Sequence, residues 1–144
     1  MSEFICRDYQ ENDYPSIEQL WVQTGVGNPA RGDNPETIEN TLKLGGKLIV
    51  LEEVATKKIT GTSWLTIDGR RVYLHHFAIL PEYQGKKLSW ILLKESLAFA
   101  KKMNLQIKLE VHKNNLKALR LYEKAGFRYL GDYLVYIIRN LDEI

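Results

Sequence analysis

The sequence predicts an α/β (α+β) fold in one domain, with helices flanking a mixed, mostly antiparallel central sheet. Segments with the two-residue period of strands alternate with segments that have the 3.6-residue period of amphipathic helices. The chain of 144 residues is long enough to bury a substantial core. No internal repeat or interdomain linker divides it, so we expect residues 1–144 to form a single domain.

The first half of the chain predicts one strand, two helices and a meander of three strands. Ile17, Leu20 and Trp21 follow helical spacing ahead of Gly25, a residue type that often ends helices. Asp68-Gly69 between two alternating segments is a strong signal for a two-residue hairpin turn. In chain order, we expect a strand over 4–8, a helix from a cap at Asp13 to Gly25, a loop over 25–33, a helix from Asn34 to about Leu44, and strands over 47–54, 58–67 and 70–79.

The second half predicts a long helix, a strand, a second helix and two final strands. Five apolar residues of the long helix gather on or beside one face: Leu88, Ile91, Leu92, Phe99 and Met103. Gly126 is placed to end the second helix in a left-handed conformation. In chain order, we expect helices over 85–102 and 115–125 with a strand over 106–111 between them, and then strands over 127–133 and 134–141.

Composition and segment lengths exclude several classes of protein. Apolar residues make up 44% and charged residues 26%, as in ordinary globular proteins, and the longest aliphatic runs are far too short to span a membrane. Residues 1–8 lack the basic start, apolar stretch and cleavage site of a secretory signal. Cys6 is the only cysteine, which excludes an internal disulfide and a cysteine-rich zinc site and favours a reducing, cytoplasmic location.

The formal net charge of +2 is unevenly distributed along the chain. It is −4 over residues 1–83, +8 over 84–128 and −2 over 129–144. The basic part suits phosphate groups and the acidic part suits a cation, although solvated helix faces also explain both. The basic helices carry few interleaved aromatic residues, so we expect neither nucleic acid nor a membrane as a partner.

A strand through residues 77–79, a tight loop and a helix start form the first informative site. Main-chain N–H groups and the positive end of the helix dipole make such a junction an anion site. Lys86 and Lys87 add positive charge there. Solvated lysines at an ordinary helix start are the plain alternative.

Residues 109–127 contain the second site. Glu110 lies near a strand end, on the opposite face from its apolar neighbours, and Asn115 is placed to cap the next helix. Ala118 is small enough for another group to approach closely, and Tyr122 follows within the helix. Taken singly, a solvated carboxylate, a cap and a core aromatic explain these residues, but their combination points to a site.

These motifs resemble those of the GNAT N-acetyltransferase superfamily, and the resemblance covers nearly the whole chain. Members carry Q/R-x-x-G-x-G/A in a loop that holds the coenzyme A pyrophosphate, and Gln84 and Gly85 stand here in a similar PEYQGK context. Members often carry Asn-x-x-Ala-x-x-x-Tyr followed by Gly-Phe, which matches Asn115, Ala118, Tyr122, Gly126 and Phe127. The LEV triplet at 109–111 resembles the ribosomal-protein alanine N-acetyltransferase branch, and the chain as a whole is similar to small bacterial members.

The resemblance implies an acetyl-CoA-dependent N-acetyltransferase that uses no metal. The strand edge at Phe77, Ala78 and Ile79 would hydrogen-bond the pantetheine arm through its main chain. Glu110 matches the general base of that branch and Tyr122 its general acid. The other coenzyme contacts that the resemblance implies are Gln84, Gly85, Lys86, Lys87, Leu88, Ser89, Trp90 and Asn115.

Two positions depart from the loop motif. Lys87 stands where the family has glycine, and Ser89 where it has glycine or alanine. The family's glycine lets main-chain amides approach the pyrophosphate without a Cβ in the way. Lys87 either points outward and adds a cation near the phosphates or weakens coenzyme binding, and the sequence leaves both open.

The chemistry of acetyl transfer assigns roles to the same residues. An alkylammonium with a pKa of roughly 10 must first lose a proton, which Glu110 would accept directly or through water if burial raised its pKa. Tyr122, with a reference pKa of about 10, stays protonated and can donate to the leaving thiolate, while a main-chain N–H polarises the carbonyl. Cys6 has no evident activating base, so we expect direct transfer rather than an acyl-enzyme.

The three histidines receive lesser roles. His75 and His76 are adjacent on a strand, so we expect them to face opposite ways, to share no metal and to be structural. His112 lies two residues from Glu110 and is a candidate auxiliary base. Some family members place an acidic base on the strand that carries His75 and His76, and its absence here favours Glu110.

The expected acceptor is a primary amine, either a peptide N-terminus or a small amine, lying over the first two helices and the loop 25–33. The alternative function is a non-catalytic acyl-CoA-binding or regulatory domain on the same fold, which Lys87 favours and the presence of both Glu110 and Tyr122 opposes. The sequence leaves open whether the chain forms a homodimer. Relatives pair through their last strands, and the apolar run 134–138 would allow the same here. A buried core strand explains that run equally well.

Overall fold

The computed structural model describes residues 3–144 of the chain. These residues form two units, one that ends at Val111 and one that comprises His112–Ile144. That the whole chain forms one domain stays a prediction.

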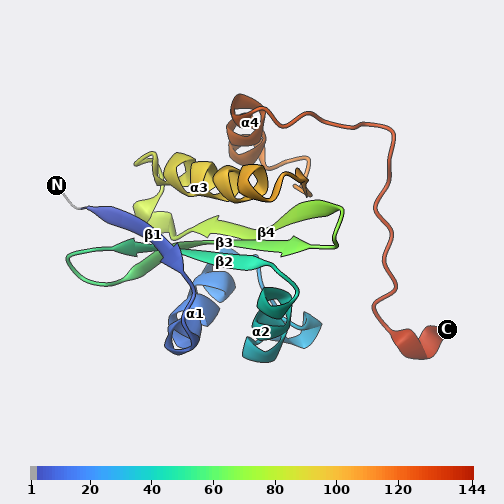
Figure 1. The fold of residues 1–144 in the computed structure, drawn as a ribbon, viewed down its shortest axis with the longest axis horizontal. Helices are drawn as coiled ribbons and strands as arrows, with labels where there is room; N and C mark the ends of the chain where they lie inside the picture. The colour runs from blue at the N-terminus through green and yellow to red at the C-terminus, as the bar shows by residue number, and fades with distance from the viewer. Residues whose placement is uncertain (1–2) are drawn as a thin grey trace. The chain divides into compact units, whose positions relative to one another are not determined.

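The first unit is built on a five-stranded sheet with the strand order β1-β2-β3-β4-β5 (Figure 1). Its strands are β1 (Phe4–Asp8), β2 (Lys47–Glu53), β3 (Ile59–Ile67), β4 (Arg71–Ile79) and β5 (Gln106–Leu109). Neighbouring strands are antiparallel except for β4 and β5, which are parallel. The predicted mixed, mostly antiparallel sheet is confirmed.

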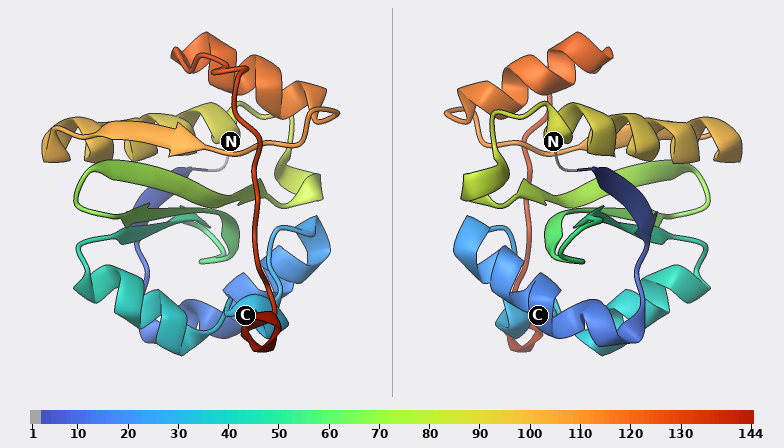
Figure 2. Two further views of the ribbon diagram at one scale, coloured as in Figure 1. Left: turned by 90° about the vertical axis from the view of Figure 1, so that its right-hand side faces the viewer. Right: turned by 90° about the vertical axis from the view of Figure 1, so that its left-hand side faces the viewer.

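Helices cover both faces of this sheet, with α1 and α2 on one face and α3 on the other (Figures 1 and 2). The helices are α1 (Tyr14–Thr24), α2 (Pro35–Lys43) and α3 (Leu88–Met103), with 3-10 turns at Glu11–Asp13, Pro29–Arg31 and Pro81–Tyr83. Asn34 caps α2 by accepting a hydrogen bond from Thr37 N at 2.9 Å, and Gly25 ends α1 with a φ of 77°.

The core on the α1–α2 face is centred on two stacked tryptophans. The rings of Trp21 in α1 and Trp64 in β3 lie 5.4 Å apart at an interplanar angle of 11°. Their indole N–H groups donate to Thr62 and Thr41, so both indole nitrogens have hydrogen-bond partners. On the other face, α3 buries Leu92 and Leu93 against the sheet.

Two helix predictions were wrong in detail. Asp13 precedes α1 as expected, but its carboxylate accepts hydrogen bonds from Arg7 and from Gln10 N rather than from an α1 amide. The long helix begins at Leu88 rather than Gly85, because Gly85 and Lys87 both have a positive φ that an α-helix cannot accept.

The buried face of α3 also differs from the predicted one. The buried side chains are Leu88, Leu92, Leu93, Ser96 and Ala100, whereas Ile91 and Met103 are exposed and Phe99 is half-buried. Ser96 lies on that face because its hydroxyl is 2.6 Å from the hydroxyl of Ser63 in β3. A hydroxyl with a buried partner fits a core, and this pairing is not visible in the pattern of apolar residues.

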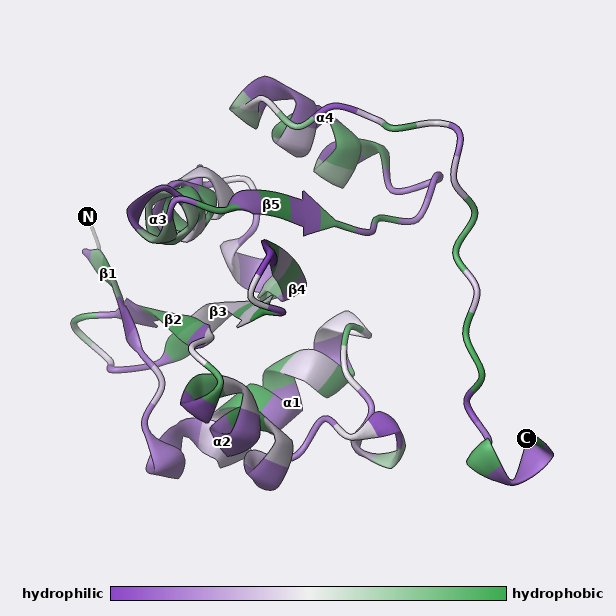
Figure 3. Ribbon diagram, turned by 45° about the vertical axis from the view of Figure 1, so that its right-hand side comes forward, coloured by the Kyte–Doolittle hydropathy of each residue, from purple (hydrophilic) through white to green (hydrophobic). Residues whose placement is uncertain are grey.

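The second unit contains α4 (Leu116–Ala125) and a long extended segment. Asn115 caps α4 through a hydrogen bond from Ala118 N at 3.3 Å, and Gly126 ends it with a φ of 106°, as predicted. The strands predicted over 127–133 and 134–141 are wrong. These residues have strand-forming side chains, several of them hydrophobic (Figure 3), and the large hydrophobic ones are mostly exposed. Within residues 3–144 they join no ladder, and a strand needs one. A 3-10 turn follows at Leu141–Glu143.

Candidate active site

The first feature of the candidate site is the parting of β4 and β5. Their parallel ladder ends at the pair Leu74–Leu109, and β4 continues beside β3 to Ile79. β5 is therefore shorter than the predicted strand over 106–111. The ladder between β4 and β5 therefore does not reach residues 77–79 of β4, which are the residues predicted to bind the pantetheine arm. Main-chain N–H and C=O groups on such an edge can bind an extended amide chain as a further strand does.

The loop after β4 is tied back to the strand that it leaves. The Gln84 side chain donates a hydrogen bond of 2.9 Å to the carbonyl oxygen of Ile79, the last residue of β4. Tyr83 donates to a carboxylate oxygen of Glu53 at 3.1 Å, and the Lys86 ammonium lies 5.2 Å from the centre of the Tyr83 ring. These contacts fix the path of the loop into α3.

The start of α3 keeps the backbone shape of a glycine-rich loop although a lysine stands in it. Gly85 has a φ of 80° and Lys87, the residue before α3, has a φ of 62°. Lys87 therefore adopts the left-handed conformation that the family's glycine would adopt easily. Its side chain is exposed, and the first-turn amides of Leu88 and Ser89 follow at the positive end of the helix dipole.

We expect Lys87→Gly to raise the free energy of unfolding by about 0.5–1 kcal/mol. The left-handed conformation costs a non-glycine residue roughly 1–2 kcal/mol, and the greater freedom of glycine in the unfolded chain offsets roughly 0.5–1 kcal/mol of that gain. Urea unfolding measures the difference. The matched control is Lys86→Gly, which relieves no positive φ and removes the contact with Tyr83, so it should lower stability. A Lys87→Gly variant less stable than the wild type would contradict the account of this loop.

The residue Glu110 follows β5 with its side chain exposed. Lys108 pairs with Tyr73 in the ladder, and strand alternation puts Glu110 on the same face as Lys108. Exclusion of solvent by its surroundings lowers the pKa of His75, and the neighbouring His76 acts in the same direction. The Glu110 carboxylate acts in the opposite direction and only partly offsets this lowering of the His75 pKa.

A β-bulge overturns the prediction for the two adjacent histidines. Between the pairs Thr62–Ala78 and Trp64–His75, β3 contributes one residue and β4 contributes two, and His76 has a φ of 45°. Both imidazoles consequently face the α1–α2 side of the sheet. His75 Nε2 lies 3.0 Å from Thr66 Oγ1, and the His76 ring centre lies 4.6 Å from that of Trp21 and 5.0 Å from that of Trp64.

The same bulge places His76 beside a carboxylate that the sequence did not single out. His76 Nε2 is 3.0 Å from an Asp33 carboxylate oxygen, and both side chains are largely but not fully buried, at 16% and 15% exposure. From the sequence, this pair could have been sought only as an aspartate in the loop before α2 and a histidine on β4. Nothing in the spacing of these residues revealed that a bulge brings them together.

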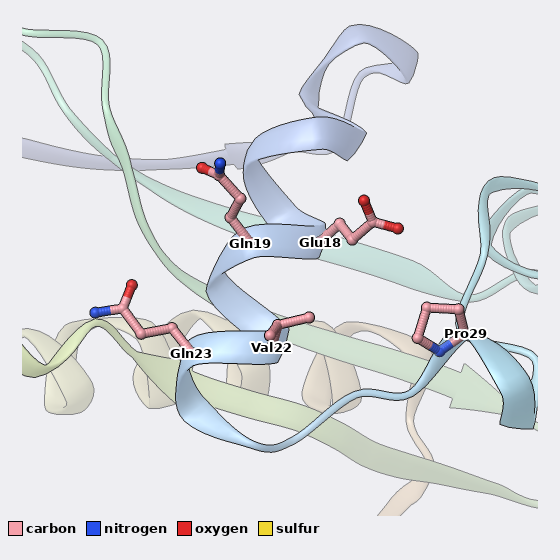
Figure 4. Close-up of a pocket in the computed structure, with 5 residues that line it drawn as sticks. All are labelled: Glu18, Gln19, Val22, Gln23 and Pro29. Carbon is pink, nitrogen blue, oxygen red and sulfur yellow. The ribbon is translucent and has the colours of Figure 1, made fainter.

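An open hollow lies on the outer side of α1, next to the loop 25–33 (Figure 4). Its volume is about 500 Å³, and it is lined by Glu18, Gln19, Val22, Gln23 and Pro29. Glu18 also accepts a hydrogen bond from the Tyr14 hydroxyl at 3.3 Å, and that hydroxyl bonds the carbonyl oxygen of Asp33 at 2.9 Å. The hollow presents one carboxylate and two amides, groups that suit a cationic or hydrogen-bonding ligand.

The remaining predicted site residues belong to the second unit. Tyr122 in α4 is buried, its ring centre lies 5.6 Å from that of Phe127, and burial raises the pKa of its phenol to about 12. Asn115 is engaged as the α4 cap. His112 accepts a hydrogen bond at Nδ1 from Asn114 N at 3.1 Å. Tyr122 is thus protonated at neutral pH, as the general-acid role requires.

Residues 3–144 show neither a metal-binding cluster nor a membrane-spanning helix. Among these residues, no group of three or more histidine, cysteine, aspartate and glutamate side chains is placed to hold a metal ion. In the same range, no helix has the length and apolar character that crossing a membrane requires.

Comparisons with known proteins agree with this geometry. The spermine/spermidine N(1)-acetyltransferase of Bacillus subtilis (strain 168) is 40% identical over 65 residues, which are 43% of this chain and 42% of that protein. The chain therefore matches less than half the length of this curated relative. The structure of the ribosomal-protein-S18-alanine N-acetyltransferase from Escherichia coli is similar with a TM-score of 0.74 at 19% identity, over 88% of this chain and 78% of that one.

A further solved structure shares the fold. AAC(6')-Iy in complex with the bisubstrate analog CoA-S-monomethyl-acetylneamine matches with a TM-score of 0.77 at 14% identity, over 96% of this chain and 100% of that one. The model of the acetyltransferase (GNAT) family matches residues 7–127, which include strands β2 to β5, the loop between β4 and α3, and α4. The chain belongs to the GNAT acetyltransferase family.

Proposed function

We propose that this protein transfers an acetyl group from acetyl-CoA directly to a primary amine. The observation that carries the proposal is the course of β4, which leaves β5 at Leu74 and runs into a loop and helix start with left-handed residues at Gly85 and Lys87. That arrangement offers a strand edge followed by an anion site, in the order in which coenzyme A presents its amides and its pyrophosphate. Membership of the GNAT family supports the same assignment.

The residues of this segment fit the two parts of the coenzyme. The main chain of Phe77, Ala78 and Ile79 would bind the pantetheine amides, and the first turn of α3 would bind the pyrophosphate with Lys86 and Lys87 nearby. Gln84 holds the loop to the end of β4. Leu88 is buried and anchors the start of α3 in the core, while Gly85, Ser89 and Trp90 complete the segment. Asn115 is proposed as a coenzyme contact from the second unit.

The proposed chemistry uses one carboxylate and one phenol of this chain. Acetyl-CoA supplies an acetyl thioester, and the nitrogen of the acceptor forms the new N–C bond as the C–S bond breaks. Glu110 accepts a proton from the acceptor ammonium, directly or through water. Tyr122 donates its proton to the leaving sulfur and is reprotonated from solvent, while the nitrogen loses its second proton, so that one proton is released for each acetyl group transferred. Burial raises the pKa of the Cys6 thiol to about 11, which supports direct transfer without a cysteine-bound acetyl group.

The proposed acceptor lies over α1, α2 and the loop 25–33. The hollow beside Glu18 and its two glutamines supports a cationic small amine, and the curated relatives named as spermine acetyltransferases support a polyamine. A peptide N-terminus is the second candidate, because the LEV triplet is similar to that of the ribosomal-protein acetyltransferase branch. We further propose that the protein works in the cytoplasm, and that any homodimer involves the extended segment 127–141.

A titration with acetyl-CoA tests the proposal and its non-catalytic alternative. Ligand at one hundred times its dissociation constant should stabilise the fold by about 2.7 kcal/mol, read as a rise in the unfolding temperature, while ATP should not reproduce this effect. Transfer of labelled acetyl to spermidine, or to a peptide that begins with alanine, then separates an enzyme from a binding domain. Binding without transfer to any amine would favour the non-catalytic domain, and no binding at millimolar acetyl-CoA would contradict the proposal.

A further inference from the structure

The bulge in β4 builds a histidine–aspartate pair that none of the roles above uses. His76 lies at the bulge with its Nε2 atom buried and 3.0 Å from an Asp33 carboxylate oxygen. Among the described residues Nε2 has no well-formed hydrogen bond, so it lies close to the Asp33 carboxylate without being bonded to it. Catalytic pairs are often loosely aligned before substrate binds.

Both partners are held from several sides. Thr62 Oγ1 donates to the His76 carbonyl oxygen at 2.8 Å and accepts from the Trp21 indole N–H at 2.8 Å, which ties the bulge to α1. The second oxygen of Asp33 accepts the main-chain N–H of Asn28 at 2.6 Å. Asp33 is thus fixed by its own loop, with one oxygen left to face the imidazole.

The backbone of His76 also has an unusual, left-handed φ angle. A φ of 45° is rare for a residue with a Cβ, and such strained positions occur where surrounding structure holds a side chain for a purpose. The strain turns the imidazole to the same face as His75 and Glu110, where the acceptor is proposed to lie. Since Nε2 faces Asp33, Nδ1 is the ring nitrogen that can receive a proton.

We propose that His76, oriented by Asp33, is a second proton acceptor in the transfer. Conversion of an ammonium into an amide removes two protons from nitrogen, of which one ends on the departing sulfur and the other leaves to solvent. Glu110 is proposed for one of these protons, and His76 Nδ1 takes the other. The imidazolium so formed lies beside the Asp33 carboxylate, which favours its positive charge, and close to the rings of Trp21 and Trp64. Asp33 is a positioning residue, and the inference rests on the proposed function.

His75 is the natural control for His76. It is adjacent in the chain and faces the same side, but its Nε2 contacts the Thr66 hydroxyl rather than a carboxylate. The titratable groups near the His75 ring are Tyr73, His76, Asp33 and Glu110, and the carboxylate nearest the His76 ring is that of Asp33. If any imidazole on this face could accept the proton, replacement of His75 would lower the rate as well.

The first experiment reads the tautomer of His76 and needs no acceptor. The chain has three histidines, so nitrogen NMR of the rings can be assigned with single variants. At a pH where the ring is neutral, His76 should carry its proton on Nε2, facing Asp33, and Asp33→Asn should weaken that preference. A neutral His76 protonated on Nδ1 would overturn the proposal, because that nitrogen would then have no lone pair for the proton.

The second experiment uses His76→Gly, since glycine accepts a φ of 45° without strain. We expect kcat/KM to fall by about 10²-fold, acetyl-CoA affinity to stay near wild type, and added imidazole to restore part of the rate. The unfolding temperature should fall, because the ring packs against Trp21 and Trp64. Asp33→Asn should move the acidic limb of the pH–rate profile to lower pH. His75→Gln should leave both the rate and its profile unchanged.

The outcomes separate this inference from the proposed function. A wild type that binds acetyl-CoA and acetylates an amine, together with a fully active His76→Gly, would overturn the role of His76 alone. A His76→Gly variant that loses activity and is not rescued by imidazole would show a structural histidine and also overturn it. Failure of the wild type to bind acetyl-CoA would instead remove the proposed function.

Discussion

Replacement of Glu110 by glutamine is expected to lower kcat/KM for the amine by between 10² and 10⁴, with the largest loss at low pH. Glutamine has nearly the same shape but cannot accept a proton. At low pH the neutral form of the amine is scarcest, so the rate of a variant that lacks the carboxylate should fall most there. The measurement is a pH–rate profile for wild type and variant with the same acceptor.

The exposure of Glu110 makes this a clean substitution. An exposed side chain at the end of β5 can change to an amide with little effect on stability, so unfolding temperature and acetyl-CoA affinity should match the wild type. Glu123→Gln, on the exposed surface of α4, is the matched control and should retain full activity. A Glu110→Gln profile that superposes on that of the wild type would place the base elsewhere.

Tyr122→Phe is expected to lower kcat by between 10² and 10⁴ while acetyl-CoA affinity changes little. The phenol is the proposed donor to the leaving sulfur, and a pKa of about 12 keeps it protonated throughout the neutral range. Phenylalanine keeps the ring, and with it the edge contact with Phe127. Steady-state kinetics give kcat with whichever of spermidine and the alanine peptide reacts faster. A binding titration gives the affinity for acetyl-CoA.

The control for this prediction is another tyrosine of the second unit. Tyr129 is 93% exposed, so Tyr129→Phe should leave kcat unchanged. Solvent deuterium should slow the wild type if proton donation to sulfur limits the rate, and this isotope effect should change in Tyr122→Phe. An unchanged kcat in Tyr122→Phe would remove the phenol from the acid role.

Much of the fold followed from the sequence because its signals are local. The hairpin turn at Asp68-Gly69, the cap at Asn34 and the helix end at Gly126 each depend on one or two residues, and all three lie where they were expected. The family motifs were likewise local enough to indicate the loop before α3. The structure added that Lys87 preserves the left-handed backbone of that loop.

The errors arose where structure depends on distant neighbours. The strands predicted over 127–141 have suitable side chains, but strand formation requires a partner that the pattern cannot name. The opposite orientation expected for His75 and His76 assumed a regular strand, and a one-residue mismatch between β3 and β4 reverses it. The pairing of His76 with Asp33 is a consequence of the same mismatch, which explains why the sequence did not reveal it.

The central claim is that acetyl-CoA binds along the end of β4 and the start of α3. Hydrogen exchange of the main-chain amides with and without coenzyme A tests it most directly. The account predicts slower exchange within residues 77–79 and 85–90 when coenzyme A is present, with little change in β1 and β2. Protection confined to other segments, or none at saturating coenzyme A, would contradict it.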